Sequence, residues 1–219
     1  MLGRLPPNLR VLDVGCGPGM QTLELARLTQ GPIAALDTHR PFLDELRRRA
    51  GEAGFHRRIM PVNAAMASMP FAAGSFDLIW SEGAMYIMGF SQALHAWKAL
   101  LRDAGQIVVT EPCWLKADLP SVVREHWAEY PAMTTIEGCL CRIEAAGYRG
   151  IGHFTLPERS WWDDYYGPKE QRLFMLREKY AGDEEVLSSI DKALSELDVH
   201  RRYGSYYGYV FFAMRCEST

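Results

Sequence analysis

The chain has 219 residues, a formal net charge of −3, 48% hydrophobic residues and 23% charged residues. This length and composition are typical of one globular domain with a sizeable core. No apolar run reaches the ~18 residues that a membrane-spanning helix needs, and the near-neutral charge argues against a dedicated nucleic-acid binder. Five scattered cysteines, with no apolar leader at the start, favour a reducing, cytoplasmic location.

Short apolar runs alternate with helix-like segments along the whole chain. Buried strands are predicted at residues 11–14, 33–37, 59–62, 76–80, 106–110, 150–156 and 205–215. Helices are predicted at 21–30, from Pro41 to about residue 50, from Ser91 to Gly105, from Thr134 or Thr135 to Gly147, and within 157–200. This alternation predicts one doubly wound α/β domain over residues 1–219, decorated by insertions at about 112–133 and 157–200.

The loop after the first predicted strand reads Asp13-Val14-Gly15-Cys16-Gly17-Pro18-Gly19-Met20. Its glycines allow sharp turns and a close approach of the backbone to a ligand at the start of a helix. A dinucleotide site of the G-x-G-x-x-G type would need glycine in place of Met20. The acidic residue at the strand end therefore favours a ligand with an ammonium group over a nicotinamide cofactor with its pyrophosphate.

Residues 11–26, VLDVGCGPGMQTLELA, resemble the first motif of class I S-adenosylmethionine-dependent methyltransferases. The resemblance continues through Leu36-Asp37, through 69–79 and through 99–110, ALLRDAGQIVVT. Residues 80–86 and 153–158 are similar to motifs of a bacterial subfamily of the type 11-like methyltransferases. The resemblance covers about residues 10–215. It implies a mostly parallel, seven-stranded Rossmann-like sheet, with helical insertions that form a lid over the acceptor site.

The resemblance also implies a set of cofactor contacts, in which S-adenosyl-L-methionine binds and leaves as S-adenosyl-L-homocysteine. The backbone of Gly15 and Gly17 would meet the methionine part and the ribose. Asp13 would orient the loop or pair with the ligand amine. Asp37 would accept hydrogen bonds from the ribose hydroxyls. The remaining contacts are assigned to Thr38 and Met66 beside the adenine, Ser81 or Glu82 at the amine end, and Gln21 and Thr22 at the carboxylate.

Two features depart from the family pattern. Ala65 stands at an adenine-binding position where many relatives carry an acid, so either Asn63 replaces that acid or the hydrogen bond to the adenine is absent. The lead before residue 11 is short, whereas relatives commonly begin with helices that cap the site. Either the 157–200 insertion covers the site instead, or the start is truncated.

Methyl transfer needs a well-placed acceptor and a base for its proton. Glu82 and Glu111, which follow the fourth and fifth strands, are candidates for that role or for substrate contact. Tyr86 is a candidate for the acceptor pocket, and His126 is a candidate in the first insertion. The aromatic run 161–166 is interpreted either as packing or as an acceptor pocket for an aromatic or cationic molecule. No metal-ligand spacing is present.

The sequence therefore predicts a methyltransferase that acts on an O, N or S atom of a small-molecule acceptor. Two alternatives stay open: a non-catalytic binder of S-adenosylmethionine or S-adenosylhomocysteine, and a nicotinamide-dependent oxidoreductase. We expect a monomer or homodimer, with neither a nucleic acid nor a membrane as partner.

Overall fold

The computed structural model describes residue 6 and residues 8–217. The contacts within the chain divide it into two compact units. The first unit comprises Met1–Glu111, Glu137–Phe154 and Val210–Thr219, and the second comprises Pro112–Ile136 and Thr155–Tyr209. Both predicted insertions, 112–133 and 157–200, fall within the second unit.

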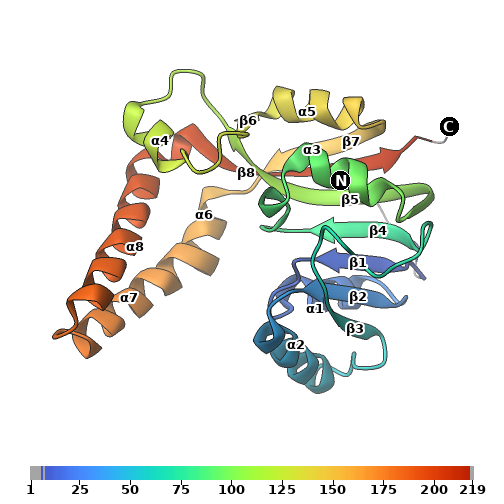
Figure 1. Ribbon diagram of the computed structural model, residues 1–219, viewed down its shortest axis with the longest axis horizontal. Helices are drawn as coiled ribbons and strands as arrows, with labels where there is room; N and C mark the ends of the chain where they lie inside the picture. The colour runs from blue at the N-terminus through green and yellow to red at the C-terminus, as the bar shows by residue number, and fades with distance from the viewer. Residues whose placement is uncertain (1–5, 7, 218–219) are drawn as a thin grey trace. The chain divides into compact units, whose positions relative to one another are not determined.

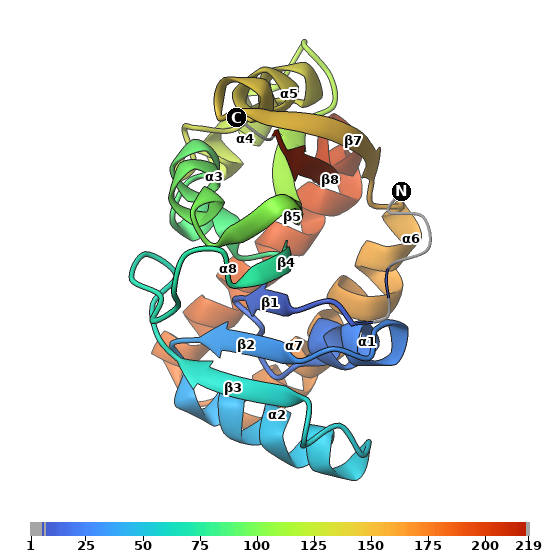
Figure 2. The same ribbon diagram turned by 90° about the vertical axis from the view of Figure 1, so that its right-hand side faces the viewer.

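One sheet forms the core of the first unit, with its strands in the order β3-β2-β1-β4-β5-β8-β7 (Figure 2). These strands are β1 (Val11–Val14), β2 (Ile33–Asp37), β3 (Ile59–Asn63), β4 (Phe76–Ser81), β5 (Leu101–Trp114), β7 (Tyr148–Thr155) and β8 (Tyr207–Cys216). Neighbours from β3 to β5 pair in parallel, whereas β8 points opposite to β1 and β4 in Figure 1. The predicted α/β fold with a mostly parallel sheet is confirmed.

The burial of the strands explains their sequences. All four residues of β1 and the first four of β2 are buried, as expected for strands that are covered on both faces. The weakest predicted strand, β3, contains Pro61 and lies at an edge of the sheet. Proline has no N–H group to donate to a neighbouring strand, so an edge is where a strand tolerates it.

The helices of the first unit follow the strands. They are α1 (Met20–Leu28), α2 (Arg40–Glu52), the 3₁₀ turn η1 (Met85–Ile87), α3 (Phe90–Lys98) and α5 (Ile136–Ala145). Figure 2 shows α1 and α3 on opposite sides of the sheet. The apolar stripes of these helices complete the core, with Leu43 and Leu46 on α2 and Leu94 and Trp97 on α3 at most 1% exposed.

The predicted ends of two helices are wrong. The helix predicted from Ser91 to Gly105 ends at Lys98, and β5 already begins at Leu101. Phe76 pairs with Leu101 and Leu78 pairs with Gln106, so residues 102–105 form a bulge in β5.

Thr134 and Thr135 form the short strand β6 (Thr134–Thr135), which pairs with Cys113 and Trp114 of β5. The helix predicted to open at Thr134 or Thr135 begins directly after them, since α5 starts at Ile136. The first helix stops at Leu28, two residues before the predicted end, because Thr29 leaves the helical conformation and its hydroxyl donates to the carbonyl of Leu25.

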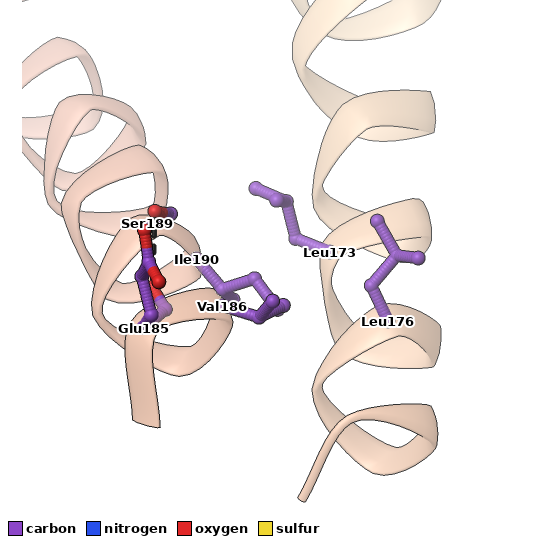
Figure 3. A pocket seen from close by; sticks show the side chains of 6 residues that line it. All are labelled: Leu173, Leu176, Glu185, Val186, Ser189 and Ile190. Carbon is purple, nitrogen blue, oxygen red and sulfur yellow. Dashed lines mark hydrogen bonds between the residues drawn. The ribbon is translucent and has the colours of Figure 1, made fainter. Parts of the chain in front are cut away.

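The second unit is mostly helical. Its elements are α4 (Ser121–His126), α6 (Glu158–Trp161), the π-helix η2 (Trp162–Tyr166), α7 (Gly167–Lys179), α8 (Glu184–Tyr203) and the 3₁₀ turn η3 (Gly204–Tyr206), together with β6. Leu173 and Leu176 of α7 and Val186 and Ile190 of α8 line a cavity of about 300 Å³, with Leu173 and Val186 pointing toward the facing helix (Figure 3). No helix among residues 8–217 is long and apolar enough to cross a bilayer.

Candidate functional site

The glycine loop connects β1 to α1 and is fixed to the end of β2. Gly15, Gly17 and Gly19 have φ angles of 73°, 52° and 88°, the left-handed region that glycine adopts without steric strain. The N–H groups of Gly15 and Cys16 both donate to the carbonyl of Leu36, at 2.8 and 3.0 Å. The loop is therefore held at the carboxyl edge of the sheet, where ligands of open α/β sheets bind.

Asp37, at the end of β2, lies beside this loop. One oxygen of its carboxylate accepts from the N–H of Gly17 at 2.9 Å, and the other accepts from the N–H of His39 at 2.8 Å. A Cβ atom added to Gly17 would meet nothing within 4 Å, whereas one added to Gly15 would lie 2.3 Å from Cβ of Ala84. The Gly17 side of the loop is thus open, and the Gly15 side is covered by the segment after β4.

Asp13 is buried in β1, with 2% of its surface exposed. Its carboxylate accepts from the Thr22 hydroxyl at 2.6 Å, which joins β1 to the first turn of α1. Burial raises the pKa of Asp13 to about 7, the Thr22 hydrogen bond opposes the rise, and the charges of Glu82 and Asp37 add to it. The structure thus brings three predicted carboxylates close enough to influence one another.

The segment after β4 is held from two sides. The buried Ser81 hydroxyl donates to the carbonyl of Val14 at 3.0 Å, and the N–H of Gly83 donates to the Thr110 hydroxyl at 2.7 Å. Glu82 is half-buried and accepts from the Trp80 indole N–H at 3.4 Å. Burial, as the largest effect, raises the pKa of Glu82, while hydrogen bonds from Trp80 and Gln21 oppose the rise.

The Ser81 hydroxyl is therefore used in a hydrogen bond to the backbone of β1. The backbone carbonyl of Ser81 stays a candidate for the predicted contact with the amine of the cofactor. Gln21 is predicted to contact the carboxylate of the ligand. In the structure its side chain forms a hydrogen bond with Glu82.

The segment after β3 carries the predicted adenine contacts. The Trp97 indole donates to the carbonyl of Met66 at 3.2 Å, which fixes this segment against α3. Asn63 donates to the carbonyls of Asp37 and Thr38 at 3.1 and 2.9 Å, and its side-chain oxygen accepts from Arg40. Because its amide is used in this way, Asn63 holds the loop after β2. The exposed Ala65 has no side-chain group to replace the acid of the relatives.

The four predicted catalytic residues fall in two units. Glu82 follows β4, Tyr86 lies in η1 with 38% of its surface exposed, and Glu111 is fully buried in β5. His126 belongs to the second unit, where its ring stacks on that of Tyr207 with 5.8 Å between centroids. Burial lowers the pKa of His126.

The aromatic run 161–166 packs inside the second unit. The rings of Trp161 and Tyr166 stack with centroids 5.5 Å apart, and both contact the ring of His200, which is 1% exposed. These contacts support the packing interpretation for these two aromatic residues. Asp163 and Asp164, between them, are exposed.

The sequence did not indicate two residues that hold the loops of the site in place. Thr110 holds Gly83, and Trp97 holds Met66, across 27 and 31 residues of sequence. No motif connects these partners, because each contact depends on how neighbouring elements pack. Within the described residues, no group of three His, Cys, Asp or Glu side chains is arranged to hold a metal ion.

Known proteins that are similar to this chain include methyltransferases. Residues 11–105 match the model of a methyltransferase domain. The predicted resemblance to class I S-adenosylmethionine-dependent methyltransferases is confirmed.

The curated relatives match this chain over part of their length. A malonyl-[acyl-carrier protein] O-methyltransferase of Legionella pneumophila is 39% identical over 74 residues, 33% of this chain and 25% of the relative. A dimethylglycine N-methyltransferase of Parasynechococcus marenigrum is 32% identical over 109 residues, 49% of this chain and 39% of the relative. The chain thus spans a quarter to two fifths of these two relatives.

Solved structures share the fold over nearly the whole chain. A methyltransferase from Geobacter sulfurreducens, in complex with S-adenosyl-L-homocysteine, superposes with a TM-score of 0.82 at 22% identity, covering 96% of this chain and 86% of that one. A [4+2]-cyclase superposes with a TM-score of 0.77, also at 22% identity, covering 100% and 79%.

Proposed function

We propose that the protein transfers the methyl group of S-adenosylmethionine to an O, N or S atom of a small-molecule acceptor. The observation that carries this proposal is the junction of Gly17 and Asp37. At this junction, the Gly17 backbone has open space on the side where a Cβ atom would lie, and it is next to the carboxylate of Asp37, the last residue of the neighbouring strand β2. This arrangement fits a ribose with an adjoining amino-acid chain, because a carboxylate has four acceptor positions and the two backbone N–H groups use two of them.

Different residues of the first unit would contact different parts of the cofactor. Asp37 would hold the ribose hydroxyls, with Thr38, Ala65 and Met66 along the adenine. Asp13 would orient the loop through Thr22 or pair with the ligand amine. When bound, the cofactor supplies a methyl group on a positively charged sulfur. An acceptor lone pair forms a bond to the methyl carbon as the carbon–sulfur bond breaks, and the electron pair of that bond stays on sulfur.

The acceptor's proton needs a base. Glu82, whose pKa is raised by burial, is our first candidate, because a general base works best when its pKa approaches the working pH. Glu111, Tyr86 and His126 remain as candidates for acceptor contact or proton transfer. Positioning is expected to supply the larger part of the acceleration, since the reaction is a displacement at carbon.

Calorimetric titration tests the cofactor assignment. We expect S-adenosylmethionine and S-adenosylhomocysteine to bind with micromolar dissociation constants, and NADH not to bind. Binding of NADH alone would support the oxidoreductase alternative. Absence of binding by all three ligands at millimolar concentration would refute the site.

A second candidate is a protein that binds the cofactor without transferring its methyl group. It is supported by the shared fold of the [4+2]-cyclase, because a fold can host several activities. Transfer of radiolabelled methyl groups to a panel of small acceptors separates the two candidates. Labelled product supports the methyltransferase, whereas tight binding with no product from any acceptor supports the binder.

The proposal includes a cytoplasmic location, a monomer or homodimer, and no nucleic-acid partner. A lid made by the segments 112–133 and 157–200 over the acceptor is also part of it. Limited proteolysis with and without S-adenosylhomocysteine and an acceptor analogue would test the lid, because a closed lid protects its own peptide bonds.

A further inference from the structure

Asn63 connects three segments at the point where the neighbouring strands β2 and β3 end (Figure 2). It is the last residue of β3, and in the parallel pairing of the two strands it lies opposite Asp37, the last residue of β2. Its side-chain amide donates to the carbonyl of Asp37 at 3.1 Å and to that of Thr38 at 2.9 Å. Its side-chain oxygen accepts from Nε of Arg40, the first residue of α2, at 3.2 Å. Asn63 therefore fastens the loop between β2 and α2 to the neighbouring strand.

These hydrogen bonds continue the pairing of the backbone beyond the end of the strands. A carbonyl needs a partner where the strand ladder stops, and the N–H of Ala64 supplies a second one for Asp37 at 3.2 Å. The amide of asparagine has two N–H donors, and Asn63 uses both on successive carbonyls. Two successive peptide planes of the loop are thus fixed in orientation by one side chain.

The second of these peptide planes also holds the carboxylate of Asp37. The carbonyl of Thr38 and the N–H of His39 belong to the same peptide group, and this N–H donates to one carboxylate oxygen of Asp37 at 2.8 Å. The other oxygen accepts from the N–H of Gly17 at 2.9 Å. Hydrogen bonds therefore run from the Asn63 amide through one peptide group to the Asp37 carboxylate, and bonds in such a chain strengthen one another.

We propose that Asn63 is a positioning residue for recognition of the cofactor's ribose. Through the peptide group between Thr38 and His39, it holds the Asp37 carboxylate in the orientation that accepts from the ribose hydroxyls. This inference rests on the proposed function, in which Asp37 contacts the ribose. It assigns Asn63 to the ribose side of the cofactor, whereas a replacement for the acid of the relatives would contact the adenine.

Calorimetric titration with three ligands separates these two roles. S-adenosylhomocysteine is the reference, its 2′-deoxy analogue lacks one ribose hydroxyl, and its inosine analogue carries an oxygen in place of the adenine amino group. The unmodified protein should bind the reference about tenfold more tightly than the 2′-deoxy analogue, because a hydrogen bond to a charged carboxylate is lost. In Asn63→Leu, which has a similar size and no polar side-chain atoms, this ratio should fall toward one. The ratio between the reference and the inosine analogue should equal that of the unmodified protein.

Lys98→Met is the matched control. Lys98 also donates to two successive carbonyls, those of Ala146 and Gly147 at 3.2 and 3.0 Å, in the turn between α5 and β7 of the same unit. That turn carries none of the proposed cofactor contacts. Lys98→Met removes both bonds and should keep the ribose preference of the unmodified protein. A loss of the preference in both variants would show that it follows the general stability of the unit, and would overturn a specific role for Asn63.

Amide hydrogen exchange measures the same positioning without a ligand. The N–H groups of Gly17 and His39 are held by the Asp37 carboxylate, so NMR should show faster exchange of both in Asn63→Leu than in the unmodified protein. Lys98→Met should leave both rates unchanged. Because Asn63 is exposed and lies on an edge strand, we expect its variant to fold, which circular dichroism checks.

The proposal is overturned if Asn63→Leu keeps the preference for the ribose, loses the preference for adenine, or leaves the exchange of both amides unchanged. It is also overturned if the unmodified protein binds the ribose and 2′-deoxy forms equally. If S-adenosylhomocysteine does not bind to the unmodified protein, the proposed function fails, and the exchange rates still decide whether Asn63 holds Asp37.

Discussion

Gly17 and Gly74 offer a matched pair for testing the ligand side of the glycine loop. Both residues have positive φ, 52° and 65°, and a Cβ atom added to either would meet nothing within 4 Å. Gly74 lies in the turn before β4, at the opposite end of that strand from Ser81 and Glu82. Replacing either glycine by alanine therefore causes similar backbone strain, but only Gly17→Ala adds a methyl group to the proposed cofactor path.

The strain of alanine in the left-handed region costs about 1–2 kcal/mol, which for a chain of this size lowers the melting temperature by roughly 2–8 °C in both variants. The affinity for S-adenosylhomocysteine should fall at least about tenfold, or ~1.4 kcal/mol, in Gly17→Ala and stay unchanged in Gly74→Ala. Thermal melts and calorimetric titration measure the two effects separately. Equal affinity in both variants would show that no ligand passes over Gly17.

Three further predictions concern the same loops. Asp37→Ala should weaken cofactor binding by about 1–3 kcal/mol, as measured by calorimetry, because it removes the proposed acceptor of the ribose hydroxyls; unchanged affinity would refute that role. Gly15→Ala should destabilise the fold more than Gly17→Ala in urea titrations, because its Cβ would lie 2.3 Å from Cβ of Ala84, and equal stability would mean that the covering segment moves freely. The pKa of Asp13 is raised to about 7 in the folded protein, so its contribution to stability is largest in acid and declines as pH rises from ~4 to ~7. Asp13→Asn, which keeps an acceptor for Thr22, should therefore gain stability relative to the unmodified protein as the pH rises from ~4 to ~7 in urea titrations, and a difference that stays constant over this range would contradict the raised pKa.

The order of elements could be predicted because parallel strands that are buried on both faces appear as short, mostly apolar runs. β1 and β2 are the clearest examples. The start of β5 could not be predicted in this way. Residues 102–105 carry charged and small residues that resemble a helix end, and only the pairing of Leu101 with Phe76 shows that the strand has already begun. Thr134 and Thr135 could be predicted only in part, since the same two residues form a short strand and directly precede the helix α5.

The glycine loop was predictable for a different reason. Positive φ angles restrict the residue type strongly, so three alternating glycines after a strand indicate a tight loop near a ligand. The contacts that hold the rest of the site are not local. Ser81 reaches Val14 and Thr110 reaches Gly83 across neighbouring strands, and serine or threonine at a strand end gives no sign of its partner.

The loops at the end of the sheet say more about the function of this chain than the sheet itself. A sheet like this one is shared by a methyltransferase and by a [4+2]-cyclase, so the sheet alone does not decide the chemistry. Asp13, Asp37 and Glu82 carry more information about function, because like charges gathered at one edge oppose one another and raise the pKa of Asp13. Asp13 and Asp37 also accept hydrogen bonds from Thr22 and from the N–H of Gly17, so they help to hold the glycine loop. The remaining cost of gathering these charges is expected where a positively charged ligand, such as the proposed cofactor, compensates for it.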